Sequence, residues 1–128
     1  SPRDALARIE TMVLMSGYEL PVRAIRQQVS SALDMIVHLE RLEDGSRRVT
    51  AITEVQRMES DVITLQDLFA FRVERVTPEH VVIGDLTATG LRPTFLHKFD
   101  KRGISLPSDL FAKKQPATAN DFQKAPAA

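Results

Sequence analysis

Residues 20 to 55, LPVRAIRQQVSSALDMIVHLERLEDGSRRVTAITEV, decide the fold of this chain. The first part predicts a helix that starts at Pro21, because the fixed φ and missing N–H of proline suit a first helical turn. Its apolar residues recur at offsets that place them on one helix face. From Asp34 the apolar period changes to two, which is typical of a strand. Asp44-Gly45 predicts a tight turn, since glycine adopts positive φ without steric cost.

A second strand, from Arg48 to Val55, returns from this turn and completes a hairpin. In the first strand, alternation separates two faces. One face carries Met35, Val37 and Leu39, and the other carries Ile36, His38 and Glu40. The stretch therefore predicts a helix–strand–turn–strand unit on which the rest of the chain packs.

The segment before this unit predicts another amphipathic helix. Ser1 and Asp4 resemble a capping box, with Pro2 at the first helical position, so a helix is expected to start here. The segment does not have the pattern of a signal peptide. Gly17 suits the left-handed position that ends a helix. The methionines of this helix, Met12 and Met15 among them, are expected to fill the core, because methionine adapts to irregular gaps.

After Val55 the polar segment 56–61 predicts a loop, and a strand begins at Val62. Two interpretations of the next residues stay open. Thr64 and Asp67 could cap a brief helical turn through Phe69, or one strand could continue to Phe71. Further along, Phe71–Val76 and Val81–Leu86 form a second predicted hairpin, in which Gly84 marks a bulge.

The last ordered segment predicts short helices. Pro93–Lys101 has an apolar face and is ended by Gly103, and Pro107–Phe111 forms one more turn. Residues 112–128 contain little that could be buried, so this tail is predicted to be disordered. The chain is thus one domain over residues 1–111, of mixed α/β class, with two N-terminal helices, a hairpin-rich sheet and short C-terminal helices.

Composition excludes several classes of function. The 128 residues include 17 basic and 17 acidic side chains, and this zero net charge gives no general attraction to nucleic acid. There are no cysteines, which excludes disulfides and thiolate metal sites. No apolar run approaches the roughly 20 residues that cross a bilayer.

Motifs for catalysis are missing from the sequence. Neither GxxxxGK(S/T) nor GxGxxG occurs, so there is no loop of backbone N–H groups to cradle a polyphosphate. His38, His80 and His97 are far apart, without the spacing of a metal site. Ser30-Ser31 lacks the G-x-S-x-G elbow of a nucleophile. An autonomous enzyme is therefore improbable, and no cofactor is expected in this chain.

Arginines form the one suggestive pattern. Arg23 and Arg26 lie off the apolar face of the helix after Pro21, and Arg47 flanks the hairpin turn together with Arg41 and Arg48. Their planar forks of donors could bind an anion or a partner's carboxylate. The competing interpretation is a solvated surface of mixed charges, since Glu40, Glu43 and Asp44 are interleaved with them.

Three segments resemble the secretion ATPases of type II and type IV systems, most closely the Tad (Flp) pilus-assembly branch. They are residues 20–55, Met58 to Phe69, and Thr89 to Leu96, and the opening Ser1 to Met15 is similar as well. One departure is Arg57, where the family usually has glycine before Met-Glu. The resemblance covers 1–111 and implies the C-terminal part of a RecA-like P-loop ATPase domain.

The resemblance implies a parent protein that binds ATP and Mg²⁺, assembles as a cytoplasmic hexameric ring and works against inner-membrane secretion platform proteins. The family's Walker A, Walker B and histidine boxes are absent here, so this chain would be inactive alone and would supply scaffold and subunit contacts. Arg23, Arg26 and Arg47 match charged family positions and are candidate interface or nucleotide-adjacent residues.

A stand-alone adaptor that docks a partner protein remains the alternative. If the chain is a fragment, its cut sheet exposes a strand edge and an apolar face, which favours self-association. An in-frame GxxxxGK(S/T) sequence upstream of Ser1 would distinguish the fragment from the adaptor.

Overall fold

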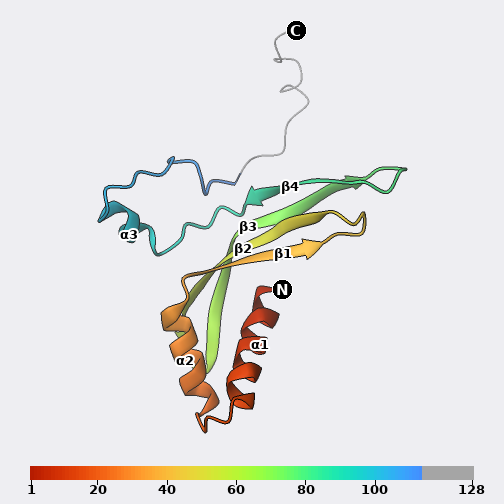
Figure 1. Cartoon of the computed structure of the whole chain (residues 1–128). Helices are drawn as coiled ribbons and strands as arrows, with labels where there is room; N and C mark the ends of the chain where they lie inside the picture. Colours follow the sequence, from red (N-terminus) through yellow and green to blue (C-terminus); the bar gives the residue numbers. More distant parts are fainter. Residues whose placement is uncertain (114–128) are drawn as a thin grey trace.

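A computed structural model describes residues 1–113, and the predicted disordered tail lies outside these residues apart from Ala112 and Lys113. The elements follow one another as two helices, four strands and a short helix (Figure 1). They are α1 (Pro2–Met15), α2 (Val22–Ala32), β1 (Met35–Arg41), β2 (Arg47–Glu59), β3 (Val62–Val76), β4 (Val82–Ala88) and α3 (Leu96–Asp100).

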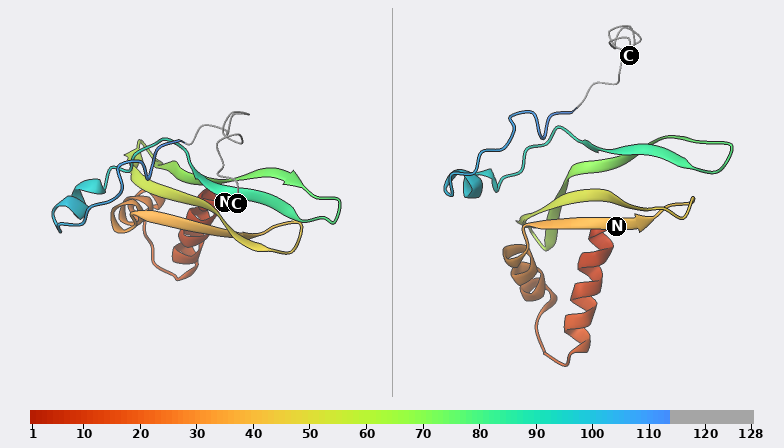
Figure 2. Two further views of the ribbon diagram at one scale, coloured as in Figure 1. Left: turned by 90° about the horizontal axis from the view of Figure 1, so that it is seen from above. Right: turned by 45° about the horizontal axis from the view of Figure 1, so that its top comes forward.

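The four strands form one antiparallel sheet in the order β1-β2-β3-β4, so each strand pairs with its neighbour in sequence. This confirms the mixed class with two N-terminal helices and a hairpin-rich sheet. Figure 2 shows α1 and α2 on one side of the sheet, with the α3 segment at the end of the sheet near α2 and the β1–β2 and β3–β4 turns at the opposite end. The β2–β3 pair is longer than its neighbours and bends toward the helices (Figure 1).

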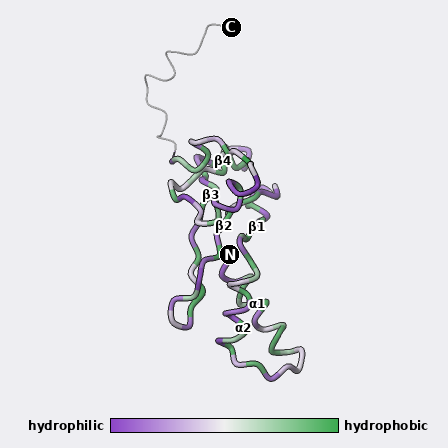
Figure 3. Tube along the Cα trace, turned by 90° about the vertical axis from the view of Figure 1, so that its left-hand side faces the viewer, coloured by the Kyte–Doolittle hydropathy of each residue, from purple (hydrophilic) through white to green (hydrophobic). Residues whose placement is uncertain are grey.

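Helix α1 begins with the predicted capping box. The Ser1 hydroxyl accepts a hydrogen bond from the Asp4 backbone N–H at 3.2 Å, and the Asp4 carboxylate accepts one from the Ser1 terminus at 3.3 Å. Gly17 follows the helix end with φ of 85°. The prediction that Met12 and Met15 fill the core is wrong, because their side chains are 62% and 80% exposed. In Figure 3 hydrophobic residues recur along α1 up to its turn into α2.

The opening unit of the sequence folds largely as predicted. Helix α2 starts at Val22, one residue later than expected, because Pro21 takes the extended conformation of an N-cap. Ile25 is its buried residue. In the β1–β2 hairpin the Gly45 N–H donates to the Leu42 carbonyl at 2.9 Å, and Gly45 has φ of 81°. The positive φ explains why glycine stands at this turn.

The prediction of a loop over 56–61 is wrong. Strand β2 continues to Glu59, and a turn at Ser60-Asp61 leads straight into β3, with Glu59 paired to Val62. Gln56, Arg57 and Glu59 are polar, yet they belong to a hairpin arm whose backbone pairs with β3, and Met58 between them packs against the hydrophobic core. A register shift lies between Val55 and Met58, where β2 carries one extra residue.

Strand β3 is uninterrupted from Val62 to Val76, so the helical turn capped by Thr64 and Asp67 is wrong and the strand alternative holds. The Asp67 carboxylate does not cap a helix; it accepts a hydrogen bond from the Thr53 hydroxyl at 2.6 Å. Pairing with β2 on one side and β4 on the other satisfies the backbone of β3, which outweighs a local cap.

The bulge expected at Gly84 lies directly opposite this glycine. The register of β3 and β4 shifts between Val73 and Arg75, so the extra residue belongs to β3, while Gly84 pairs with Val73. A Cβ added to Gly84 would lie 2.2 Å from the Arg72 carbonyl oxygen. Gly84 is therefore required for the close approach of the two backbones.

The main core lies between the two N-terminal helices and the β2–β3 arm, which is the part of this hairpin that extends beyond the pairing with β1. It contains Leu6 of α1, Val55 of β2 and Ile63 of β3, with Val29 of α2 and Leu33, which follows α2, packed against it. A hydrogen bond adds to this packing, since the Arg3 guanidinium of α1 donates to the Ile63 carbonyl of β3 at 3.2 Å. This packing fixes both helices against the arm.

A smaller aromatic cluster secures the C-terminal segment. The rings of Phe69 and Phe111 lie 5.8 Å apart, and Phe95 and Phe111 are both buried. Helix α3 is shorter than the predicted Pro93–Lys101, beginning only at Leu96. The predicted turn near Phe111 is confirmed by a hydrogen bond from the Leu110 N–H to the Pro107 carbonyl.

Replacing Gly84 with alanine tests the close approach of β3 and β4. We expect Gly84→Ala to lower the free energy of unfolding by about 3 kcal/mol, because the new Cβ must push backbone atoms apart. Gly17→Ala is the matched control, since a Cβ there meets nothing within 4 Å and only the positive φ opposes it; it should cost about 1 kcal/mol. Equal losses in urea unfolding would show that the contact with Arg72 is unimportant.

Candidate functional site

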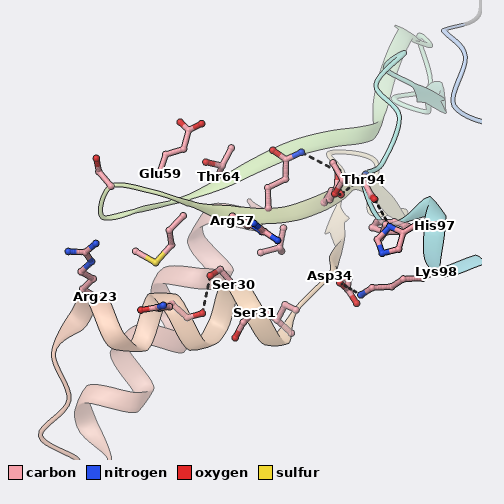
Figure 4. Close-up of a pocket in the computed structure, with 18 residues that line it drawn as sticks. Arg23, Ser30, Ser31, Asp34, Arg57, Glu59, Thr64, Thr94, His97 and Lys98 are labelled. Atoms are coloured by element: carbon pink, nitrogen blue, oxygen red, sulfur yellow. Dashed lines mark hydrogen bonds and ion pairs between the residues drawn. The ribbon is translucent and has the colours of Figure 1, made fainter.

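An open groove runs between α2 and the β2–β3 arm, and we refer to it as the α2 groove (Figure 4). Its volume is about 1110 Å³. One wall is a polar stripe of α2 that includes Arg23, Gln27, Ser30 and Ser31, residues whose spacing places them on one helix face. The opposite wall is β2 from Gln56 to its turn.

The two ends of the α2 groove carry charged pairs. At one end Arg23 Nε lies 3.5 Å from the Asp61 carboxylate, and both side chains are largely exposed. At the other end Lys98 Nζ donates to Asp34 Oδ1 at 2.8 Å. His97 lies beside this second pair and its Nδ1 is 3.1 Å from the Thr94 carbonyl oxygen. The groove thus joins α2, the arm and the α3 segment.

Glu54 is the best connected side chain of the site, and it is only 1% exposed. Its Oε1 accepts hydrogen bonds from the Thr94 hydroxyl and from the Thr94 N–H, the latter at 2.8 Å. Its Oε2 accepts from the Gln66 amide at 2.7 Å and from the Gln56 amide at 3.4 Å. These four donors come from β2, β3 and the segment before α3.

A buried carboxylate is costly unless hydrogen bonds replace its hydration. Here the four donors provide that replacement, so Glu54 ties the α3 segment to the middle of the sheet. The Gln66 amide extends the network by donating to the Arg92 carbonyl at 3.2 Å. With both oxygens occupied, Glu54 is a structural anchor and not a free acid or base.

Arg23 and Arg26, two of the candidate site residues, meet at the tip of the arm. Arg26 contacts Glu10 of α1 through two hydrogen bonds of 2.9 and 3.1 Å and donates to the Asp61 carbonyl at 2.8 Å. The hydrogen-bonded Glu10 carboxylate raises the pKa of the Arg26 guanidinium. Arg26 therefore clamps three elements together, whereas Arg23 faces the groove.

Arg47, the third candidate, lies far from this pair. It opens β2 opposite Arg41, at the end of the sheet where the β1–β2 hairpin turns, and it is exposed. The structure thus brings together Arg23 and Arg26 but not Arg47. The proposed anion site formed by all these arginines is not a single cluster.

Asp44, interpreted from sequence as a solvated turn residue, has a structural role. Its carboxylate accepts hydrogen bonds from the Ser46 hydroxyl at 2.5 Å, the Ser46 N–H at 2.9 Å and the Val82 N–H at 2.9 Å. These bonds, that from the Ser46 hydroxyl above all, lower the pKa of Asp44 to about 2. The β1–β2 turn is thereby joined to the start of β4, with which β1 and β2 share no ladder.

Two features were sought among the described residues: a cluster of metal ligands and a helix that could span a membrane. Within residues 1–113 no three side chains of the His, Asp, Glu or Cys type gather in a way that could hold a metal ion. His38 Nε2 lies 3.8 Å from Glu40 on the same face of β1, as expected for a half-exposed strand residue. In the same range, no helix combines the length and apolar character needed to cross a bilayer.

Sequence reasoning missed Glu54 as an anchor. The available signal was its position, because a charged residue stands in the strand interior between Thr53 and Val55. Its donors Gln66 and Thr94 lie 12 and 40 positions away, so their convergence required the three-dimensional fold.

Comparison with known protein families and with curated proteins gave no match for this chain.

Substitution of Glu54 tests its role as an anchor. Glu54→Ala should lower the free energy of unfolding by about 3 kcal/mol or more, because buried donors lose their acceptor. Thr94→Val, which removes one hydroxyl donor, should cost about 1 kcal/mol. Glu59→Ala is the control on the same strand, where exposure predicts a change within about 0.5 kcal/mol. Urea unfolding that gives equal values for Glu54→Ala and Glu59→Ala would contradict the role.

Asp44 provides a test that depends on pH. Its pKa is lowered from 3.8 to about 2, so its stabilising contribution is complete above pH 4 and is lost as the pH falls toward 2. The difference in unfolding free energy between the wild type and Asp44→Asn should therefore shrink over that interval. Asp109→Asn, at an exposed turn, is the control. A difference that stays constant from pH 4 to pH 2 would refute the assignment.

Proposed function

We propose that this chain is the C-terminal part of a secretion ATPase domain, of the type II/IV class and nearest to the Tad pilus-assembly branch. One observation carries the proposal. The three segments that resemble this family, 20–55, Met58–Phe69 and Thr89–Leu96, meet at the Glu54 carboxylate.

The convergence matters because each segment contributes one partner. Glu54 belongs to the first segment, Gln66 to the second and Thr94 to the third. The network shows that the three segments pack together as one structural unit in this chain. In the proposal, this unit belongs to a larger RecA-like domain.

In this proposal the chain contributes scaffold and subunit contacts, and the nucleotide chemistry belongs to the parent. The sequence contains no GxxxxGK(S/T), so ATP and Mg²⁺ would be bound by other parts of the parent. The parent would form a hexameric ring at the cytoplasmic face of the inner membrane and act on its secretion platform proteins.

The surfaces available for subunit contact follow from exposure. Arg23 and Arg47 are exposed and can reach a neighbouring subunit, whereas Arg26 is engaged by Glu10 and Asp61 within the chain. The end of α1 and its turn into α2 also expose Met15 and Tyr18. Such apolar residues suit burial against another chain.

The same apolar residues favour the adaptor as a second candidate function. A stand-alone module would use them to dock a partner protein, without any nucleotide. The two candidates differ in what surrounds the chain: the adaptor needs no P-loop, and the ATPase fragment does.

The deciding experiment is made on the protein encoded by the complete reading frame. We expect an in-frame GxxxxGK(S/T) motif upstream of Ser1, and ATP hydrolysis by the purified protein. In that protein Arg23→Glu and Arg47→Glu should lower ring assembly and the ATPase rate several-fold without changing the unfolding temperature. Arg26→Ala should instead lower the unfolding temperature, because it removes the clamp on Glu10.

The 128-residue chain by itself is the control and should bind no ATP in the presence of Mg²⁺. Tight binding by this chain, or a reading frame without a P-loop, would contradict the proposal. The second result would favour the adaptor.

A further inference from the structure

The β2 strand has an unpaired edge inside the α2 groove. The register of β1 with β2 begins at Met35 opposite Glu54, so β1 stops short of the arm. The last link between the two is the hydrogen bond from the Val55 N–H to the Asp34 carbonyl, at 2.9 Å. Beyond it, in the part of the chain that the structure describes, no strand pairs with the outer edge of Gln56–Glu59.

This edge faces a helix across an open space, which is the arrangement that accepts an added strand. The polar stripe of α2 forms the opposite wall, and Val55, Met58 and Phe95 contribute apolar atoms between the walls. The four residues of the edge span about 13 Å at the rise of a strand. An extended segment of four or five residues therefore matches the length of this edge, and it would continue the strand position that β1 occupies in the sheet.

The charged side chains of the groove favour an added segment that carries negative charge. Arg57 lies on the α2 side of β2, whereas the Glu59 carboxylate points away from α2 (Figure 4). Among residues 1–113, Arg57 makes no ion pair within 4 Å. Three carboxylates of the described residues line the groove: Asp34 pairs with Lys98, Glu54 accepts four hydrogen bonds, and Glu59 points away from α2 (Figure 4).

Arg57 also has an ordinary backbone. The residues other than glycine with positive φ are Ser60 and His80 within the described range, so Arg57 occupies its place beside the bulge without strain. Arg57 therefore fits this position of the backbone without strain, and its guanidinium is available to a ligand.

From these observations we propose that the α2 groove binds an extended acidic segment of a partner protein. The segment adds a strand to the outer edge of Gln56–Glu59, and its backbone supplies the hydrogen bonds that the edge lacks. A carboxylate of the segment pairs with Arg57, and a second reaches Arg23 at the arm tip, where it competes with the Asp61 carboxylate that lies 3.5 Å from Arg23 Nε. Backbone pairing provides affinity, and the two arginines provide the preference for acidic sequences.

The test uses the full 128-residue chain and two fluorescein-labelled hexapeptides, one alternating aspartate with valine and one alternating asparagine with valine. We expect the acidic peptide to bind, and its affinity to fall as salt is raised, because its charge pairs are partly exposed. The asparagine peptide should bind at least tenfold more weakly. Amide NMR signals of 56–59 and of the α2 stripe should shift on titration.

Two charge reversals identify the site. Arg57→Glu should weaken binding of the acidic peptide at least tenfold, and Arg57→Gln should have an intermediate effect. Arg75→Glu is the matched control, because it changes an equally exposed arginine of β3 outside the groove and should alter affinity less than twofold. Circular dichroism of each variant confirms that folding is unchanged.

Several results would overturn the proposal. These are no binding of the acidic peptide at millimolar concentration, equal binding of both peptides, or equal losses for Arg57→Glu and Arg75→Glu. Slow hydrogen exchange at 56–59 in the free chain would show that the chain's own residues 114–128 occupy the edge. A dimer in sedimentation that Arg57→Glu dissociates would make a second copy the occupant.

Discussion

The structure depends on one buried carboxylate. Glu54 lies at the point where β2 leaves β1 and enters the arm, and its four hydrogen bonds hold β2, β3 and the α3 segment together. Without those donors the charge could not stay buried, and without the charge the donors would be unsatisfied. Glu54, Gln66 and Thr94 belong to the three segments on which the proposed function is based, and all three take part in this network.

The bent β2–β3 arm determines what the rest of the molecule can do. Because β1 begins only at Met35, opposite Glu54, the arm is free of a third strand, and the space beside it becomes the α2 groove. Val55 and Ile63 of the arm pack on Leu6 in the main core, next to this groove. One hairpin therefore provides both the platform for the helices and the wall of the candidate site.

The sequence predicted the elements whose signals are local. The capping box at Ser1, the turn at Gly45 and the alternation of β1 each depend on residues close in sequence. Residues 56–61 were predicted as a loop because they are mostly polar. In the structure they are stabilised by pairing with β3, a contact that composition does not reveal. Likewise the exposed Met12 and Met15 keep a helical apolar pattern, although in this chain nothing covers them among the described residues. The sequence also could not show which arginine candidates lie together. Only the fold shows that Arg26 is bound to Glu10 and Asp61 and that Arg47 is distant from Arg23.

The Arg26 clamp gives the helical end of the molecule a mechanical character. Its guanidinium holds Glu10 of α1 and the Asp61 carbonyl at the arm tip, while its own backbone belongs to α2. One side chain therefore joins the two helices and the arm tip. Register shifts in the β2–β3 ladder lie on either side of Glu54, between Ile52 and Thr53 and between Val55 and Met58. Loss of the Arg26 guanidinium would consequently remove one contact of α1 and one contact of the arm tip at the same time, while the hydrogen bonds of Glu54 with Gln66 and Thr94 keep all their partners.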